Sequence, residues 1–251
     1  MSDRTELQWL SHDLIEYRRI LETNKAALAP LGDTTDLDRH TRYLVIADLA
    51  WRIWDLAGAI ALLLEHEFYT PAVPLIRAQF DALATIGYLA KHPRAQDESL
   101  IFLAYSYIKQ CEHFAQQPEL VNELSGILAR MPGRLVAEAR GRASRRPHTW
   151  SGLTNKKLAA AGDVTGYDQA YGYFSGETHA SLPGQYVRIV PTGNGMATIQ
   201  TGTRVQAEDV ESMANFARRS LHSAFKVMWA IFDAPPIRIN SENPADWSPP
   251  G

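Results

Sequence analysis

The chain has 251 residues, of which 45% are hydrophobic and 21% are charged, and its formal net charge is -3. These values are typical of one globular domain, and the negative charge excludes a general attraction to nucleic acid or anionic lipid. The single cysteine, Cys111, excludes an internal disulfide framework and a zinc site of several cysteines, and it favours a reducing cytoplasm.

Apolar residues at spacings of three and four predict helices through the first half of the chain. The first helix carries Leu7, Leu14 and Leu21 on one face, and a second follows the capping candidates of Asp33–Asp38 and continues to Leu63. Three further helices are predicted after it: from Pro71 to the stop at Pro93, from about Glu98 to Gln116, and from Pro118 to about Arg140.

The most apolar stretch, Leu44–Leu64, is long enough to cross a bilayer but carries Asp48, Arg52 and Asp55. Charges inside a membrane span are costly, so we expect a buried helix there. The N-terminal stretch Met1–Gln8 is polar and shows no secretory signal. The sequence therefore predicts a cytoplasmic protein without membrane contact.

The second half is more varied. A polar stretch at 141–166 holds one short helix at Asn155–Ala161, and an aromatic helix is predicted over Tyr167–Ser181. Alternating residues around Thr192-Gly-Asn-Gly195 predict a β-hairpin, and helical spacing returns at Glu208–Phe232. The predicted fold is all-α, a single helical bundle of about seven to eight helices with one inserted β-hairpin near residues 185–201. It forms one domain over 1–234, followed by a proline-rich tail over 235–251.

Common catalytic and metal-binding motifs are absent. No histidine has a glutamate three residues before it, as a ferritin-like di-metal centre requires, and no nucleophile elbow or phosphate-binding glycine loop is present. Glu65-His66-Glu67 and Cys111-Glu112-His113 are read as solvated or packing residues, because residues two apart on a helix point in different directions. We expect neither a metal nor a cofactor.

Two polar pairs remain as candidates for a site. Arg77 and Asp81 share one helix face, and Ser175 and His179 share another, with Tyr171 one turn earlier. Each pair is also compatible with a purely structural role in the core. A basic stretch with Glu138 as its only acid is compatible with phosphate contact or with a solvated helix end. Its members are Arg134, Arg140, Arg142, Arg145, Arg146 and Lys156.

The motifs Leu75-Ile-Arg77-Ala-x-x-Asp81-Ala, Trp150-Ser-Gly and Tyr171-x-x-x-Ser175-x-x-x-His179 carry a resemblance. Over roughly Leu44–Ile199 the chain resembles a bacterial family known as domain of unknown function fifty-six seventy-seven. In that family the acidic position is usually glutamate, where this sequence has Asp81. The resemblance implies an all-helical fold and no established activity.

A second, broader similarity is to helical nucleotide-binding domains, many of them metal-independent ribonucleases of toxin and phage-defence systems. Only Arg142-Ala-Ser-Arg-Arg-Pro-His148 matches the arginine-to-histidine spacing of that group, and it contains Pro147. The implied chemistry is a histidine that takes the proton of a ribose 2′-OH and an arginine that stabilises charge on the phosphate.

Two hypotheses follow, and the sequence leaves open whether the protein is an enzyme. In the first, Arg77, Asp81, Ser175 and His179 form a catalytic site for RNA or another phosphate-bearing ligand, with further contacts from Tyr171, His148 and Trp150 and from the three arginines Arg142, Arg145 and Arg146. In the second, the pairs are structural and the aromatic helix lines a ligand pocket or a homodimer surface. The first requires Arg77 and His179 to converge in a cleft.

Overall fold

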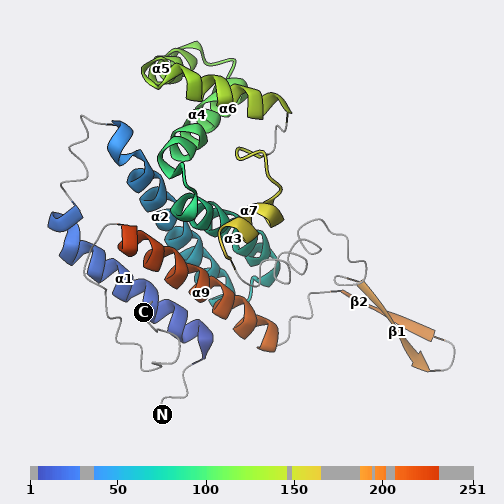
Figure 1. Cartoon of the computed structure of the whole chain (residues 1–251). Coiled ribbons are helices and arrows are strands. Elements are labelled where there is room, and N and C mark those ends of the chain that lie inside the picture. The colour runs from blue at the N-terminus through green and yellow to red at the C-terminus, as the bar shows by residue number, and fades with distance from the viewer. Residues whose placement is uncertain are drawn as a thin grey trace.

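The computed structural model describes residues 5–28, 37–145, 149–164, 187–193, 196–201 and 207–231. The fold is all-α, with eight helices among these residues (Figure 1). They are α1 (Glu6–Leu28), α2 (Leu37–Glu65), α3 (Tyr69–Lys91), α4 (Ala95–His113), α5 (Pro118–Arg130), α6 (Gly133–Arg145), α7 (Asn155–Ala161) and α9 (Ala207–Ile231).

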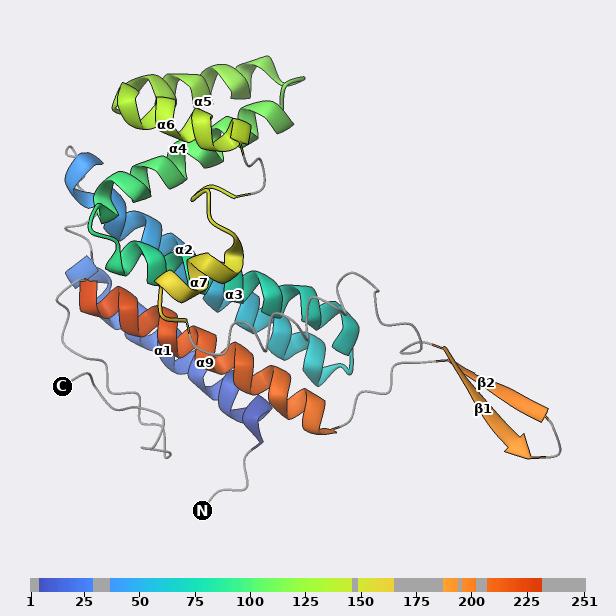
Figure 2. The same cartoon turned by 45° about the vertical axis from the view of Figure 1, so that its right-hand side comes forward.

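Four long helices, α1, α2, α3 and α9, lie side by side and enclose the main core (Figures 1 and 2). Each contributes fully buried apolar side chains, for example Leu10, Ile53, Ile76 and Leu221. The last of these helices therefore packs against the first, although 178 residues lie between them. Burying one apolar face of each helix against the others is the main stabilisation of such a bundle.

Helix α2 contains the apolar stretch that the sequence singled out. Ile46, Ile53 and Ile60 are fully buried, whereas Asp48 and Asp55 lie on the exposed face. The charges are thus compatible with a long helix because only one face enters the core. No helix within the described part of the chain is long and apolar enough to span a membrane.

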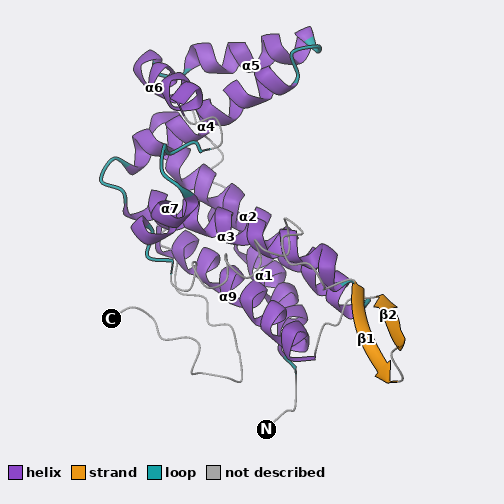
Figure 3. Cartoon of the chain, turned by 90° about the vertical axis from the view of Figure 1, so that its right-hand side faces the viewer, coloured by secondary structure: helices purple, strands orange, loops and turns teal. Residues whose placement is uncertain are grey.

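The predicted helix over Pro118–Arg140 is wrong as one element, because the chain breaks it into α5 and α6. Met131 is extended, with φ -82° and ψ 155°. The ring of Pro132 clashes with a helical conformation of the residue before it, so α5 ends there and α6 starts one residue later. Both helices pack on α4 around a second, smaller core that includes Ile101, Leu128 and Leu135 (Figure 3).

Helix α7 is short and packs on α3 through two glycines. A Cβ placed on Gly87 would lie 2.6 Å from the carbonyl oxygen of Gly162, and one placed on Gly162 would lie 2.7 Å from the backbone nitrogen of Tyr88. Only glycine permits this approach of two backbones. Thr154 caps the other end of α7, where its Oγ1 accepts a hydrogen bond from the Lys157 N–H at 3.4 Å.

Strands β1 (Val187–Gly193) and β2 (Met196–Thr201) pair antiparallel, with Val187 opposite Thr201. In Figures 1 and 2 they project away from the helices. Residues 185, 186, 194 and 195 lie outside the described residues, as do the predicted aromatic helix over 167–181 and the tail over 235–251. An inserted hairpin and the division into a domain and a tail therefore stay predictions.

Candidate functional site

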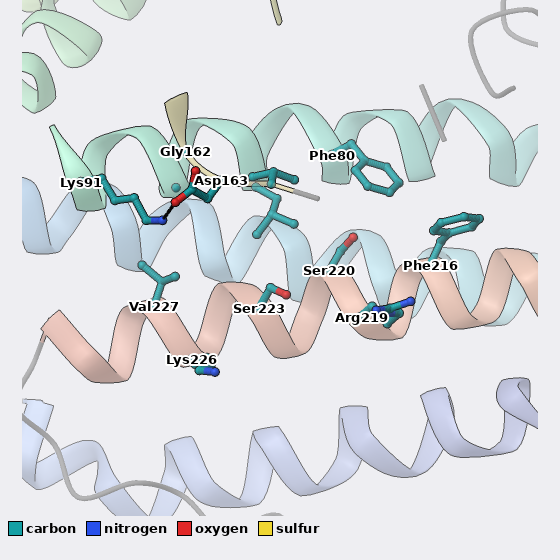
Figure 4. A pocket seen from close by; sticks show the side chains of 13 residues that line it. Phe80, Lys91, Gly162, Asp163, Phe216, Arg219, Ser220, Ser223, Lys226 and Val227 are labelled. Atoms are coloured by element: carbon teal, nitrogen blue, oxygen red, sulfur yellow. Dashed lines mark hydrogen bonds and ion pairs between the residues drawn. The ribbon is translucent and has the colours of Figure 1, made fainter. Parts of the chain in front are cut away.

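A groove of about 600 Å³ lies between α3 and α9, and the turn after α7 closes one end of it (Figure 4). Figure 4 shows Lys91 and Asp163 at one end, with the rings of Phe80 and Phe216 at the other. The groove is lined by Phe80, Leu83, Gly87 and Lys91 of α3, by Gly162, Asp163 and Val164 of the turn, and by Phe216, Arg219, Ser220, Ser223, Lys226 and Val227 of α9.

The groove is basic in a protein that is acidic as a whole. Its lining contains Lys91, Arg219 and Lys226 but, among the described lining residues, one acid, Asp163. Arg219, Ser223 and Lys226 follow one another at spacings of four and three, so they occupy one face of α9. All three side chains are exposed and line the groove. The groove therefore concentrates positive charge and hydrogen-bond donors.

Asp163 reaches across the end of the groove and forms an ion pair with Lys91 (Figure 4). Both side chains are exposed, Lys91 to 51% and Asp163 to 73%. The Gly87–Gly162 contact positions this pair, because it fixes the turn that carries Asp163 against the helix that carries Lys91. An exposed ion pair of this kind contributes about 0–1 kcal/mol and is displaced easily.

Of the predicted catalytic residues, Arg77 and Asp81 are described, and both are half-buried on α3. Oδ1 of Asp81 accepts a hydrogen bond from Nδ2 of Asn155 at 2.9 Å, so Asp81 ties α3 to α7. Ser175 and His179 lie outside the described residues, as does Tyr171. Convergence of the Arg77 and His179 side chains therefore stays a prediction.

The basic stretch is partly neutralised by its own Glu138 and by acids of α4. Arg142 donates to Glu98 of α4 at 2.7 Å and to Glu138 at 2.6 Å, and Arg134 pairs with Asp97 of α4 at 3.1 Å. The hydrogen bond with Glu98 is the largest cause of the raised pKa of Arg142. Glu138 belongs to the stretch, but the sequence did not reveal the other two acids, because Glu98 lies 44 residues before Arg142 and Asp97 lies 37 residues before Arg134.

The remaining predicted ligand contacts fall in different places. Trp150 is 8% exposed and packs edge-on against Tyr88 and Phe102, with ring centroids 5.6 and 5.1 Å away. Arg145 is exposed, and its Nε donates to the carbonyl oxygen of Gly141 at 3.1 Å. Arg146 and His148 lie outside the described residues. Within the part of the chain that the structure describes, no group of three or more His, Cys, Asp or Glu side chains is placed to hold a metal ion.

A buried polar network between α1 and α9 is the feature that the sequence analysis missed. Asp13 is fully buried, and its Oδ2 accepts from Nε of Arg218 at 2.6 Å and lies 2.7 Å from Nε2 of His222. The hydroxyl of Tyr17 lies 2.9 Å from Nδ1 of the same histidine. An ionised carboxylate only accepts, so Nε2 of His222 carries the hydrogen that points to Asp13.

One feature of the local sequence indicates this network, namely the position of Asp13. Asp13 falls three residues after Leu10 and four before Tyr17, so it stands on the apolar stripe of the first helix. A charged residue at a core position needs a partner, and Arg218 supplies it from 205 residues away. Helical spacing alone did not identify that partner.

The network shifts the pKa of three of its members. Burial by itself lowers the pKa of Arg218, but the hydrogen bond and charge of Asp13 outweigh it and raise that pKa. Burial by itself raises the pKa of Asp13, but the hydrogen bonds and positive charge of His222 and Arg218 outweigh it and hold that pKa below the ordinary value of an aspartate. Burial raises the pKa of Tyr17 well above its ordinary value, and the nearby Asp13 carboxylate adds to the effect. Asp13 is therefore ionised and Tyr17 neutral at neutral pH.

Comparison with known proteins gives one match. The model of a family of unknown function, DUF5677, matches residues 43–196, which confirms the resemblance seen in the sequence. The match covers the α3 and α7 walls of the groove, whereas α1 and α9 lie outside it. No curated protein and no solved structure matches. The chain belongs to the DUF5677 family.

Proposed function

We propose that the groove between α3 and α9 binds a small phosphate-bearing ligand such as a nucleotide. The observation that supports this is the combination of Lys91, Arg219 and Lys226 around one space of about 600 Å³. Cationic side chains and hydroxyls are the usual partners of phosphate oxygens, and this volume is in the range of small-molecule sites. The apolar end, with Phe80 and Leu83, supplies a surface for a less polar part of the ligand.

The proposal predicts that the double variant Arg219→Ala/Lys226→Ala binds AMP at least tenfold more weakly than the wild type. Two charge-assisted contacts to phosphate are lost, and each is worth roughly 1 kcal/mol or more at a partly exposed site. Isothermal titration calorimetry with AMP measures the effect. Raising the salt concentration should weaken wild-type binding as well, because exposed charges are screened.

A matched control is Arg140→Ala/Arg145→Ala, which removes the same charge from the exposed face of α6. We expect this variant to bind AMP as the wild type does. If it loses affinity while Arg219→Ala/Lys226→Ala does not, the phosphate site lies in the basic stretch of α6 and not in the groove.

We further propose that Arg77, Asp81, Ser175 and His179 are the reactive residues beside this groove, with RNA as the substrate. Arg77 and Asp81 flank Phe80, which lines the groove, and Ser175 follows Val164, another lining residue, by only eleven positions. In this reaction the 2′-oxygen of a ribose loses its proton to His179 and attacks the phosphorus. The bond to the 5′-oxygen breaks, and the leaving oxygen takes up a proton.

This second proposal predicts that the purified protein cleaves RNA in the presence of EDTA and that His179→Ala abolishes cleavage. The control His113→Ala, on the exposed end of α4, should cleave like the wild type. Gel analysis of a labelled oligoribonucleotide measures both. An uncut RNA, together with a melting temperature several degrees lower in Arg77→Ala, would instead assign the polar pairs a structural role.

A further inference from the structure

Asp163 stands at a position in the fold where glycine is the usual residue. Helix α7 ends with the hydrogen bonds Asp163 N–H to the Ala160 carbonyl at 3.2 Å and Val164 N–H to the Ala159 carbonyl at 2.9 Å. This is the pattern of a Schellman motif, whose residue after the C-cap is left-handed. Asp163 accordingly has φ 53°.

Local stability does not account for an aspartate here. A left-handed backbone costs about 1 kcal/mol for a residue other than glycine, although Asn and Asp tolerate it better than most. A negative charge is also unfavourable beside the unpaired carbonyl groups at a helix C-terminus. Both effects favour glycine or asparagine at this position over the aspartate that the chain carries.

The conformation does place the Asp163 carboxylate on Lys91, at the end of the basic groove (Figure 4). A carboxylate bound to a lysine ammonium has the same chemistry as a phosphate oxygen bound to it. The pair is largely exposed, so an incoming anion reaches Lys91 without unfolding the turn. The left-handed conformation thus places the Asp163 carboxylate at the groove, where it contacts Lys91.

We propose that Asp163 is an internal competitor for the ligand phosphate, which holds Lys91 when the groove is empty and leaves it when a phosphate binds. The inference rests on the proposed binding function of the groove and names the residue that limits its affinity. Ligand binding then releases the Asp163 side chain, so occupancy of the groove is coupled to the turn at Gly162–Val164. No covalent step is involved.

The test is the substitution Asp163→Asn, with AMP as the probe in a calorimetric titration. Asparagine adopts the left-handed conformation as readily as aspartate, so the variant changes the charge and keeps the turn. We expect AMP affinity to rise roughly two- to sixfold, the range set by the strength of an exposed ion pair. The matched control Asp48→Asn removes the same charge from the exposed face of α2 and should leave the affinity unchanged.

Competition between Asp163 and phosphate for Lys91 predicts a second result. In the Lys91→Ala background, which lacks the contested ammonium, Asp163→Asn should no longer raise the affinity. The inference is overturned if Asp163→Asn raises AMP affinity by the full amount in the Lys91→Ala background, or does not raise it in the wild-type background. In either case, AMP binding by the wild type still supports the proposed function. If neither the wild type nor Asp163→Asn binds AMP, both proposals fail.

Discussion

Gly87→Ala is expected to destabilise the protein by roughly 1–3 kcal/mol, the usual cost of adding a methyl group to a packed contact. Its Cβ would lie 2.6 Å from the carbonyl oxygen of Gly162, and backbone atoms yield less easily than the end of a side chain. The higher helix propensity of alanine offsets only about 1 kcal/mol. Thermal unfolding followed by circular dichroism should show a melting temperature several degrees lower.

Gly58→Ala is the matched control on α2, because a Cβ there meets no atom within 4 Å. The same substitution in an open helical position should raise stability by about 0.5–1 kcal/mol. The two variants are thus expected to shift the melting temperature in opposite directions. Equal shifts of the melting temperature would mean that α7 does not pack on α3 through Gly87 and Gly162. The contact that positions the turn carrying Asp163 would then be absent.

The second large effect is expected for Asp13→Ala, which should cost about 3–5 kcal/mol of folding stability. The substitution leaves the buried Arg218 guanidinium without the carboxylate 2.6 Å from its Nε. It also removes the hydrogen-bond acceptor of His222 and so loosens the link from α9 to Tyr17. Urea unfolding curves measure the loss, with Glu22→Ala as the control. Glu22 pairs with Arg18 on the exposed face of α1, where an ion pair contributes about 0–1 kcal/mol.

The pH dependence of a second stability difference, between the wild type and Asp13→Asn, tests the charge of Asp13. Its pKa is lower in the folded protein than in the unfolded chain. The group therefore stabilises the fold fully above its ordinary pKa, and this stabilisation is lost as the pH falls through the lower, folded value. The gap in stability between wild type and Asp13→Asn should be constant near neutral pH and shrink in acid. A gap that does not change below pH ~4 would show that Asp13 is not ionised in the fold.

Several elements were predictable because their cause is local. The apolar stripes marked the long helices, and the short helix predicted around Asn155–Ala161 is α7. The break between α5 and α6 was equally local, since Pro132 forces Met131 out of the helix, but the apolar spacing continues across it and concealed it. Arg77 and Asp81 were located correctly on one helix, whereas the hydrogen bond from Asn155 to Asp81 depends on how α7 packs.

By itself, the sequence determined the all-α class, the membership in the DUF5677 family and the apolar stripes of the long helices. Only the tertiary structure decided which faces meet. Helical spacing identifies an apolar face but not its partner, because apolar burial has no direction and fits many neighbours. The Asp13–Arg218 pair joins two residues that are 205 positions apart, and the groove joins Lys91 to Arg219 and Lys226. Both arise from the packing of α9 between α1 and α3, which no local pattern in the chain specifies.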